Sequence, residues 1–195
     1  MLFSSLTFIF IFLPFVLLFY YLSDDKYKNA ILFIFSLIFY SWGEPKYVII
    51  MLISIIFNYF IAIIIDKISN RKTRKIVFIF SIFVNVFVLF VFKYLDFFIS
   101  NTNLLFKTHI PLRNIALPIG ISFYTFQILS YIIDVYNKKV KVQKNFIYLG
   151  MYISFFPQLI AGPIVRYTDI VKQLKKRNWN FLKKIGKIFR KKLRI

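Results

Sequence analysis

Long apolar stretches, each bounded by polar or basic residues, follow one another along the chain. We interpret the following ranges as candidate membrane segments: 1–22, 30–42, 47–65, 76–92, 115–136 and 146–165. The longer ones can cross a hydrocarbon core about 30 Å thick as helices that rise ~1.5 Å per residue. None shows the alternation of apolar and polar residues that indicates a strand. The sequence therefore predicts an all-α, polytopic transmembrane protein with about five to six membrane segments.

The composition supports a membrane protein and excludes several kinds of site. Of 195 residues, 59% are hydrophobic and 27 are phenylalanine, which is too apolar for a soluble domain. We interpret the phenylalanines as lipid-facing. The absence of cysteine excludes disulfides, thiolate metal sites and a thiol nucleophile, and the single histidine, His109, excludes a site that needs two imidazoles. We expect neither a metal site nor a bound cofactor.

The net charge of +20 is carried by loops between the apolar stretches and by the C-terminal region, which favours membrane loops over a nucleic-acid surface. Cytoplasmic loops tend to collect Lys and Arg. With the loops 66–75 and 137–145 in the cytoplasm, the loops on that side hold 11 basic residues and those on the other side hold 4. This predicts a multi-pass inner (plasma) membrane protein with an extracytoplasmic N-terminus. The stretch 94–100 is expected to lie in the membrane interface.

The last apolar stretch contains Pro157 and the pair Gly162–Pro163, which end or kink a helix. If 146–165 crossed the membrane fully, the region that follows, with 12 Lys and Arg against one Asp, would lie outside. We favour a re-entrant or broken helix near Pro157 to Pro163, because it keeps this basic region in the cytoplasm. The chain then divides into a transmembrane region, 1–166, and a basic amphipathic tail, 167–195, whose last part could equally begin a further membrane helix.

A second broken segment, 117–136, carries Pro118 and Gly120 near its start. Irregular backbone inside a bilayer is tolerated only where protein or water satisfies it, so the two segments indicate a cavity lined by protein. The candidate substrate-binding residues are Gln127, Gln158 and Arg166. Each glutamine could face the cavity or hydrogen-bond a neighbouring helix, and Arg166 could bind a donor phosphate or a lipid phosphate. The residues interpreted as shaping the backbone are Pro118, Gly120, Pro157, Gly162 and Pro163.

Other polar residues in the apolar stretches have plainer interpretations. Two pairs spaced four apart, Ser54 with Asn58 and Ser81 with Asn85, predict hydrogen bonds between helices rather than substrate contacts. Asp134 lies one turn before Lys138 and Lys139, so we expect an interfacial salt bridge or a helix-end contact there.

Four stretches taken together resemble the membrane-bound O-acyltransferase family, in particular its bacterial branch that acetylates alginate. They are 41–47 (Ser-Trp-Gly-Glu-Pro-Lys-Tyr), 117–127 (Leu-Pro-Ile-Gly-Ile-Ser-Phe-Tyr-Thr-Phe-Gln), 131–136 (Tyr-Ile-Ile-Asp-Val-Tyr) and 155–167 (Phe-Phe-Pro-Gln-Leu-Ile-Ala-Gly-Pro-Ile-Val-Arg-Tyr). The resemblance extends to about residue 181. It implies a ring of membrane helices around a funnel, in which a buried histidine promotes transfer of an acyl group from a cytoplasmic thioester donor such as acetyl-CoA. The acceptor would be a hydroxyl of an extracytoplasmic polysaccharide, reached with a partner acyltransferase.

In that family the histidine lies in the C-terminal half, and His109 has no family motif around it. We therefore assign no catalytic residue to this chain. The chain resembles the N-terminal half of such an enzyme, whether truncated, frameshifted or split, and is expected to be inactive alone. The alternative that we keep open is a non-enzymatic membrane transporter or scaffold, since transporters also use broken helices.

Overall fold

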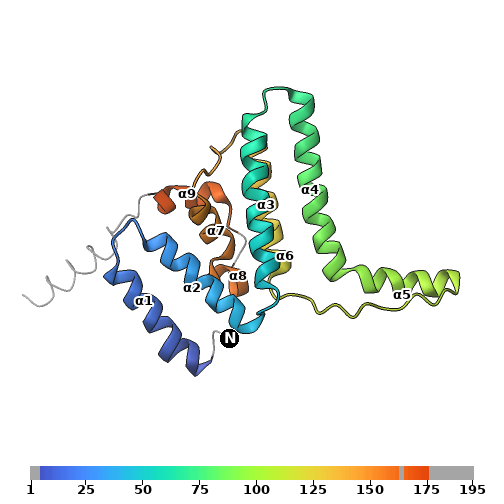
Figure 1. Ribbon diagram of the computed structural model, residues 1–195, viewed down its shortest axis with the longest axis horizontal. Helices are drawn as coiled ribbons and strands as arrows, with labels where there is room; N and C mark the ends of the chain where they lie inside the picture. The colour runs from blue at the N-terminus through green and yellow to red at the C-terminus, as the bar shows by residue number, and fades with distance from the viewer. Residues whose placement is uncertain (1–4, 163–164, 176–195) are drawn as a thin grey trace, which may run out of the picture.

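The computed structural model describes residues 5–162 and 165–175 (Figure 1). Every regular element in these ranges is a helix. The elements are the π-helical turn η1 (Phe8–Phe12) and the α-helices α1 (Leu13–Leu22), α2 (Lys28–Gly43), α3 (Val48–Lys67), α4 (Arg71–Lys93), α5 (Leu95–Phe106), α6 (Ile121–Tyr136), α7 (Phe146–Ser154), α8 (Phe156–Ala161) and α9 (Tyr167–Lys175). The predicted all-helical class is therefore confirmed for the described residues.

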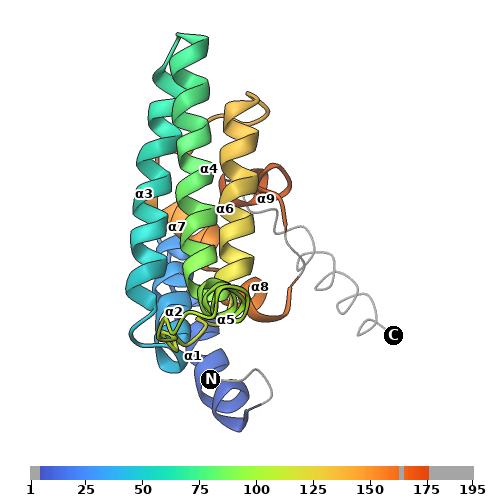
Figure 2. The same ribbon diagram turned by 90° about the vertical axis from the view of Figure 1, so that its right-hand side faces the viewer.

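The helices α3, α4 and α6 pack side by side, α2 packs against α7, and α1 covers α2 (Figures 1 and 2). Within the described ranges, α3 with 20 residues and α4 with 23 are long and apolar enough to cross a membrane. Several other apolar helices are shorter than 18 residues. A membrane location fits these helices, whereas the number of crossings stays a prediction.

Pro14 disturbs the first helix in a specific way. A proline removes one backbone donor, and its ring crowds the carbonyl four residues before it. The backbone relaxes into the π-helical turn η1, in which Leu13 N–H donates to the carbonyl of Phe8, five residues earlier. Such π turns inside a helix are known responses to a local obstruction. The helix then continues as α1, with Pro14 in its first turn.

The interpretation of the phenylalanines as lipid-facing was wrong for one group of them. Phe8, Phe12, Phe39 and Phe156 are buried in one cluster, where edge-on and tilted ring pairs have centroids 5.3–6.1 Å apart. Aromatic rings favour these geometries because their edges and faces carry opposite partial charges. The cluster fixes the N-terminal helices and α2 against α8.

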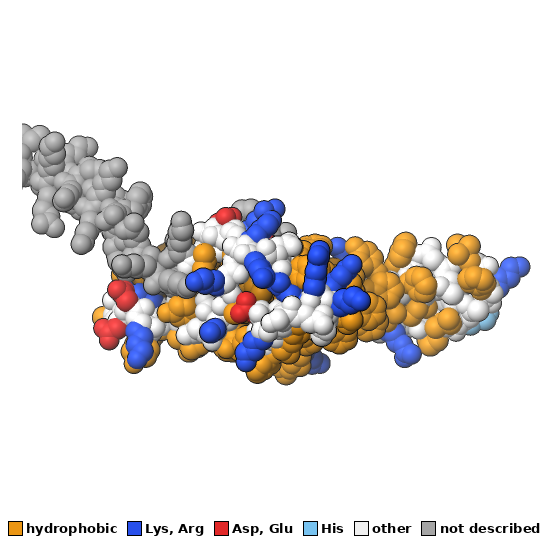
Figure 3. Space-filling model, turned by 90° about the horizontal axis from the view of Figure 1, so that it is seen from above, with side chains coloured by type: hydrophobic (Ala, Val, Ile, Leu, Met, Phe, Trp, Pro, Cys, Tyr) orange, Lys and Arg blue, Asp and Glu red, His pale blue; other side chains and the backbone are white. Residues whose placement is uncertain are grey.

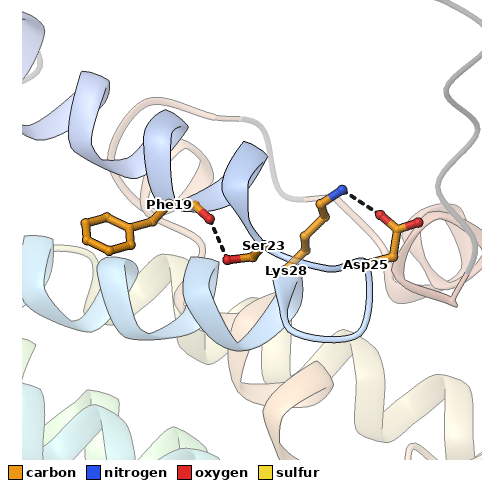
Figure 4. Close-up of polar contacts among 4 residues, drawn as sticks. All are labelled: Phe19, Ser23, Asp25 and Lys28. Atoms are coloured by element: carbon orange, nitrogen blue, oxygen red, sulfur yellow. Dashed lines mark hydrogen bonds and ion pairs between the residues drawn. The ribbon is translucent and has the colours of Figure 1, made fainter.

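The turn between α1 and α2 is held by its own side chains (Figure 4). Ser23 Oγ donates to the carbonyl of Phe19 at 2.6 Å and so satisfies an acceptor at the end of α1. Lys28 Nζ pairs with Asp25 Oδ1 and lies over the ring of Tyr20. Lys28 is itself buried, and α2 begins with it, two residues earlier than the predicted apolar stretch.

A buried amide pair joins α3 to α4, as the spacing predicted. Asn58 Nδ2 donates to Asn85 Oδ1 at 3.0 Å, and Asn85 Nδ2 donates to Asn58 Oδ1 at 2.9 Å. Ser81 Oγ lies 3.5 Å from Asn58 Oδ1, and Ser54 contributes only its backbone carbonyl, to Asn58 Nδ2. The prediction of hydrogen bonds between helices is confirmed for this pair of helices.

The two basic loops lie at the same end of the bundle, where Lys and Arg side chains gather (Figure 3). Arg74 Nη2 donates to the carbonyls of Val135 and Tyr136, at 3.2 and 2.6 Å, and the guanidinium lies over the Tyr136 ring. The start of α4 therefore caps the end of α6. This shared end agrees with the prediction that both loops lie on one side of a membrane.

The predicted salt bridge from Asp134 to the lysines was wrong. The Asp134 side chain is buried on the inner face of α6, and its Oδ2 has no hydrogen-bond partner. Lys138 and Lys139 are exposed beyond the helix end, where Lys138 has a φ of 58°. The helix-end contact that does form uses backbone only, because Lys139 N–H donates to the Asp134 carbonyl.

The predicted segment 115–136 becomes helical only from Ile121 onward. Proline disfavours helical backbone in the residue before it, and Gly120 has a φ of 78°, which no residue of a right-handed helix adopts. The helix can therefore start only after Gly120. Before it, residues 107–118 form a non-helical segment that carries the exposed His109.

The Asn58–Asn85 pair gives a test of the interface between α3 and α4. Asn58→Leu is expected to lower the free energy of unfolding by about 1–2 kcal/mol, because it leaves the Asn85 amide without its partner in an apolar interface. Asn58→Leu combined with Asn85→Leu should cost less than the sum of the two single variants. Unfolding titrations in detergent measure the free energies of the two single variants and the double variant, with Ser54→Ala as a near-neutral control. Additive costs would contradict a direct bond.

Candidate functional site

The sixth apolar stretch is broken where its prolines and glycine predicted. α7 ends at Ser154, and Phe155 leaves helical geometry with φ −54° and ψ 109°. α8 begins at Phe156, with Pro157 in its first turn, where the missing N–H of proline costs no helical hydrogen bond. α8 ends at Gly162, whose N–H donates to the Gln158 carbonyl. Pro163 lies outside the described residues.

The break frees backbone groups that a continuous helix would pair internally, and two neighbouring helices bind them. The Phe156 N–H, which would bond to the Tyr152 carbonyl in an unbroken helix, donates to Ser36 Oγ of α2 at 3.3 Å. The Tyr152 carbonyl accepts instead from Gln127 Nε2 of α6 at 2.7 Å. The irregular backbone is thus satisfied inside protein, as an apolar surrounding requires.

The chain then folds back along α7. The Val165 carbonyl accepts from Tyr152 Oη at 2.9 Å. The ring of Tyr167 packs edge-on against Tyr131 and Tyr152, with centroids 4.9 and 5.1 Å away. Its hydroxyl accepts from Gln143 Nε2 at 2.8 Å, and burial raises the pKa of this phenol. Gln143 lies just before the start of α7. The contact with Tyr167 therefore brings the chain back to the N-terminal end of α7.

The second broken segment meets the first. Gly120 lies against α8, so that a Cβ built on it would come 3.1 Å from Leu159 Cγ and 3.3 Å from the Leu159 carbonyl oxygen. The turn at Pro118–Gly120 and the helix after Phe155 are therefore in direct contact. The sequence predicted a cavity associated with both segments; they touch here, but the cavity described next has no lining residue from 117–136.

An open cavity of about 460 Å³ lies between α8 and α9. Its lining is mainly apolar and consists of Phe155, Pro157, Gln158, Gly162, Val165, Asp169 and Ile170. The polar side chains on this lining are Gln158 and Asp169, and the Asp169 carboxylate accepts from Thr168 Oγ1 at 3.1 Å. Apolar walls with a few polar groups are typical of small-molecule sites.

The candidate residues from the sequence separate into different roles. Gln158 lines the cavity, together with Pro157 and Gly162. Gln127 is buried away from the lining and binds the Tyr152 carbonyl. Arg166 is exposed, and its backbone carbonyl accepts from Asp169 N–H. The structure thus brings Gln158 to the cavity and gives Gln127 the role of joining two helices.

Sequence reasoning missed Asp169 and the two tyrosines, Tyr152 and Tyr167, that hold the returning chain. Asp169 carried a weak signal, because it is an acidic residue in the otherwise basic region that follows the break. The tyrosines carried little signal of their own, although Tyr167 ends the family-like stretch 155–167, since the chain holds 13 tyrosines and most apolar stretches include one or more.

Comparison with curated proteins finds relatives along most of the chain. It is 38% identical over 182 residues to the probable alginate O-acetylase of Pseudomonas aeruginosa, a match that covers 91% of this chain and 35% of that protein. It is 34% identical to the peptidoglycan O-acetyltransferase of Helicobacter pylori, over 93% of this chain and 40% of that protein. The probable alginate O-acetylase of Pseudomonas putida is 36% identical, over 91% of this chain and 38% of that protein.

The chain therefore spans a little over a third of the length of the curated relatives that it matches. No family model and no solved structure matches it.

The contact between Gly120 and Leu159 can be tested by substitution. Gly120→Ala is expected to lower the free energy of unfolding by about 1–2 kcal/mol, because left-handed backbone disfavours a Cβ. Leu159 crowds the added Cβ and raises this cost. Combining Gly120→Ala with Leu159→Ala should remove the cost of crowding but not the cost of the left-handed backbone. Detergent unfolding measures both variants, with Ser122→Ala on the ordinary helical backbone of α6 as control. A Gly120→Ala protein as stable as the parent would contradict the strained turn.

Proposed function

Because the chain is homologous to part of the membrane-bound O-acyltransferases, we propose that it forms part of an enzyme that transfers an acyl group to hydroxyls of an extracytoplasmic polysaccharide. The observation that carries the proposal is the extended similarity to proteins named as O-acetylases of two different polymers. It makes acetyl the first candidate for the acyl group. The non-enzymatic transporter or scaffold has no such observation in its favour.

The donor is an acyl thioester such as acetyl-CoA, and the cavity between α8 and α9 is its proposed binding place. The apolar lining suits the carbon chain of a thioester, and the Gln158 amide can donate a hydrogen bond to an acyl carbonyl. Arg166, exposed beside the cavity, suits the phosphate of such a donor. These groups bind and orient; none of them is a base for the acceptor hydroxyl.

The base is proposed to come from a part of the enzyme outside this chain. The family resemblance implies a neutral imidazole, which can take the hydroxyl proton as the thioester carbonyl is attacked. His109 does not serve this role in the proposal, because it is exposed on residues 107–118 and does not line the cavity. A separate acyltransferase partner would carry the acyl group onward to the polysaccharide.

The proposed topology places both basic loops in the cytoplasm and the N-terminus outside the inner membrane. In its favour, the loops share one end of the bundle, and Tyr167 returns to that end beside Gln143. The segment 146–166 would then be re-entrant, and the region from 167 onward would leave on the cytoplasmic side. The proposed surroundings of the structure are membrane lipid.

The activity can be tested in a strain that lacks its own polysaccharide O-acetylation. The chain is expressed alone and together with a polypeptide that supplies the rest of the relatives' length, and ester-linked acetate is released from the polysaccharide and measured. We expect acetylation only in the second case. Acetylation in neither case would overturn the proposed function. Acetylation by the chain alone would overturn the proposal that the base lies outside this chain.

The two glutamines give a matched pair of variants in that assay. Gln158→Met is expected to lower acetyl transfer per folded molecule about tenfold, which corresponds to the loss of ~1.4 kcal/mol from one hydrogen bond at the reacting carbonyl. Gln127→Met is expected to lower stability by about 1 kcal/mol, because the Tyr152 carbonyl loses its donor. Initial rates measured at equal amounts of folded enzyme separate the effect on acetyl transfer from the effect on stability. Equal rates for parent and Gln158→Met would remove Gln158 from the donor site.

A further inference from the structure

Helix α5 has a polar face that is fastened to the segment returning toward α6. Asn103 Nδ2 donates to the Ile110 carbonyl at 2.8 Å, and Ile110 N–H donates to Asn103 Oδ1 at 2.9 Å. Arg113 N–H donates to Asp96 Oδ1 at 2.8 Å. This face of α5 is therefore covered by the chain itself.

The opposite face of α5 is apolar and uncovered within the described structure. Phe97, Phe98, Leu104 and Leu105 are each 60–79% exposed. Their spacing places them on one side of a helix with 3.6 residues per turn. Asn101 lies among them, and its amide is satisfied locally because Nδ2 donates to the Phe97 carbonyl.

This face continues an aromatic stripe that runs along α4. Phe83 and Phe87 stack at 6.0 Å between ring centroids and are both exposed. Phe90 follows on the same side of α4, and its ring meets Phe98 of α5 edge-on at 6.0 Å. Whatever surrounds the exposed side of α4 therefore also reaches the apolar face of α5.

The length and composition of α4 indicate that it is surrounded by membrane. Its 23 residues correspond to ~34 Å, about the thickness of a hydrocarbon core, and Lys93 marks the end opposite the basic loop. Figure 1 shows α5 leaving α4 sideways at this end, with the returning segment on the side away from the bundle. The apolar face of α5 thus borders the same space as α4.

We propose that α5 lies in the membrane interface, with the acyl chains of phospholipids on its apolar face and the returning segment toward water. The occupant is lipid and not a protein partner, because the face is continuous with the exposed side of a membrane-length helix. Lys93, Lys107 and Arg113 flank it and suit phosphate headgroups. The proposal needs a membrane location only and does not depend on acyl transfer.

The absence of cysteine makes site-directed spin labelling direct. The full chain is reconstituted into vesicles of phosphatidylethanolamine and phosphatidylglycerol as Leu105→Cys, Leu104→Cys or His109→Cys, each with a nitroxide label. Phe83→Cys on α4 is the reference for lipid, and circular dichroism checks that each variant keeps its helix content. Oxygen concentrates in the bilayer, whereas a water-soluble nickel chelate is excluded from it.

The ratio of oxygen to nickel accessibility is expected to be several-fold higher at both leucines than at His109, and to approach that of Phe83. A ratio at both leucines equal to that at His109 would place this face in water and overturn the proposal. If the labels at both leucines are shielded from oxygen and from the nickel chelate, a protein covers this face and the proposal is overturned.

Discussion

Backbone hydrogen bonding at Phe155 is the constraint on which the rest of this structure depends. An apolar environment offers no water to a freed carbonyl or amide, and each unpaired group costs several kcal/mol. The chain leaves helical geometry at this point, so neighbouring helices must supply partners. Gln127 of α6 binds the Tyr152 carbonyl, and Ser36 of α2 binds the Phe156 amide. The break therefore fixes how α2, α6 and α7 sit relative to one another.

The packing around α8 follows from the same constraint. A six-residue helix has too few internal hydrogen bonds to hold its shape alone, so it needs contacts on several sides. Phe156 enters the aromatic cluster with Phe8, Phe12 and Phe39, and Leu159 receives the turn at Gly120. The cavity lies on the remaining side, where the chain returns toward Tyr167. A site built this way is positioned by packed side chains rather than by a flexible loop.

The sequence predicted those features that depend on local chemistry. Proline and glycine marked both breaks, because their backbone restrictions act within a few residues, and the spacing of Asn58 and Asn85 from their serines indicated inward polar faces. It could not distinguish Gln127 from Gln158, since both are amides in apolar surroundings and only the packing of α7 decides which one meets the Tyr152 carbonyl. The salt bridge of Asp134 was predicted wrongly for the same reason. Lysines follow it in the sequence, but Asp134 lies on the buried face of its helix.

The proposed position of α5 bears on the candidate site through the chain between them. The returning segment is fastened to α5 by Asn103 and Asp96, and it leads without an intervening helix to Gly120, which rests on Leu159 of α8. If lipid holds α5 at the membrane surface, the same lipid sets the depth at which this turn meets α8. The cavity beside Gln158 would then keep a fixed distance from one face of the bilayer. The proposed transfer, from a donor on the cytoplasmic side to an acceptor on the other side, would require such a fixed depth, because an acyl group can be passed on only where both can reach it.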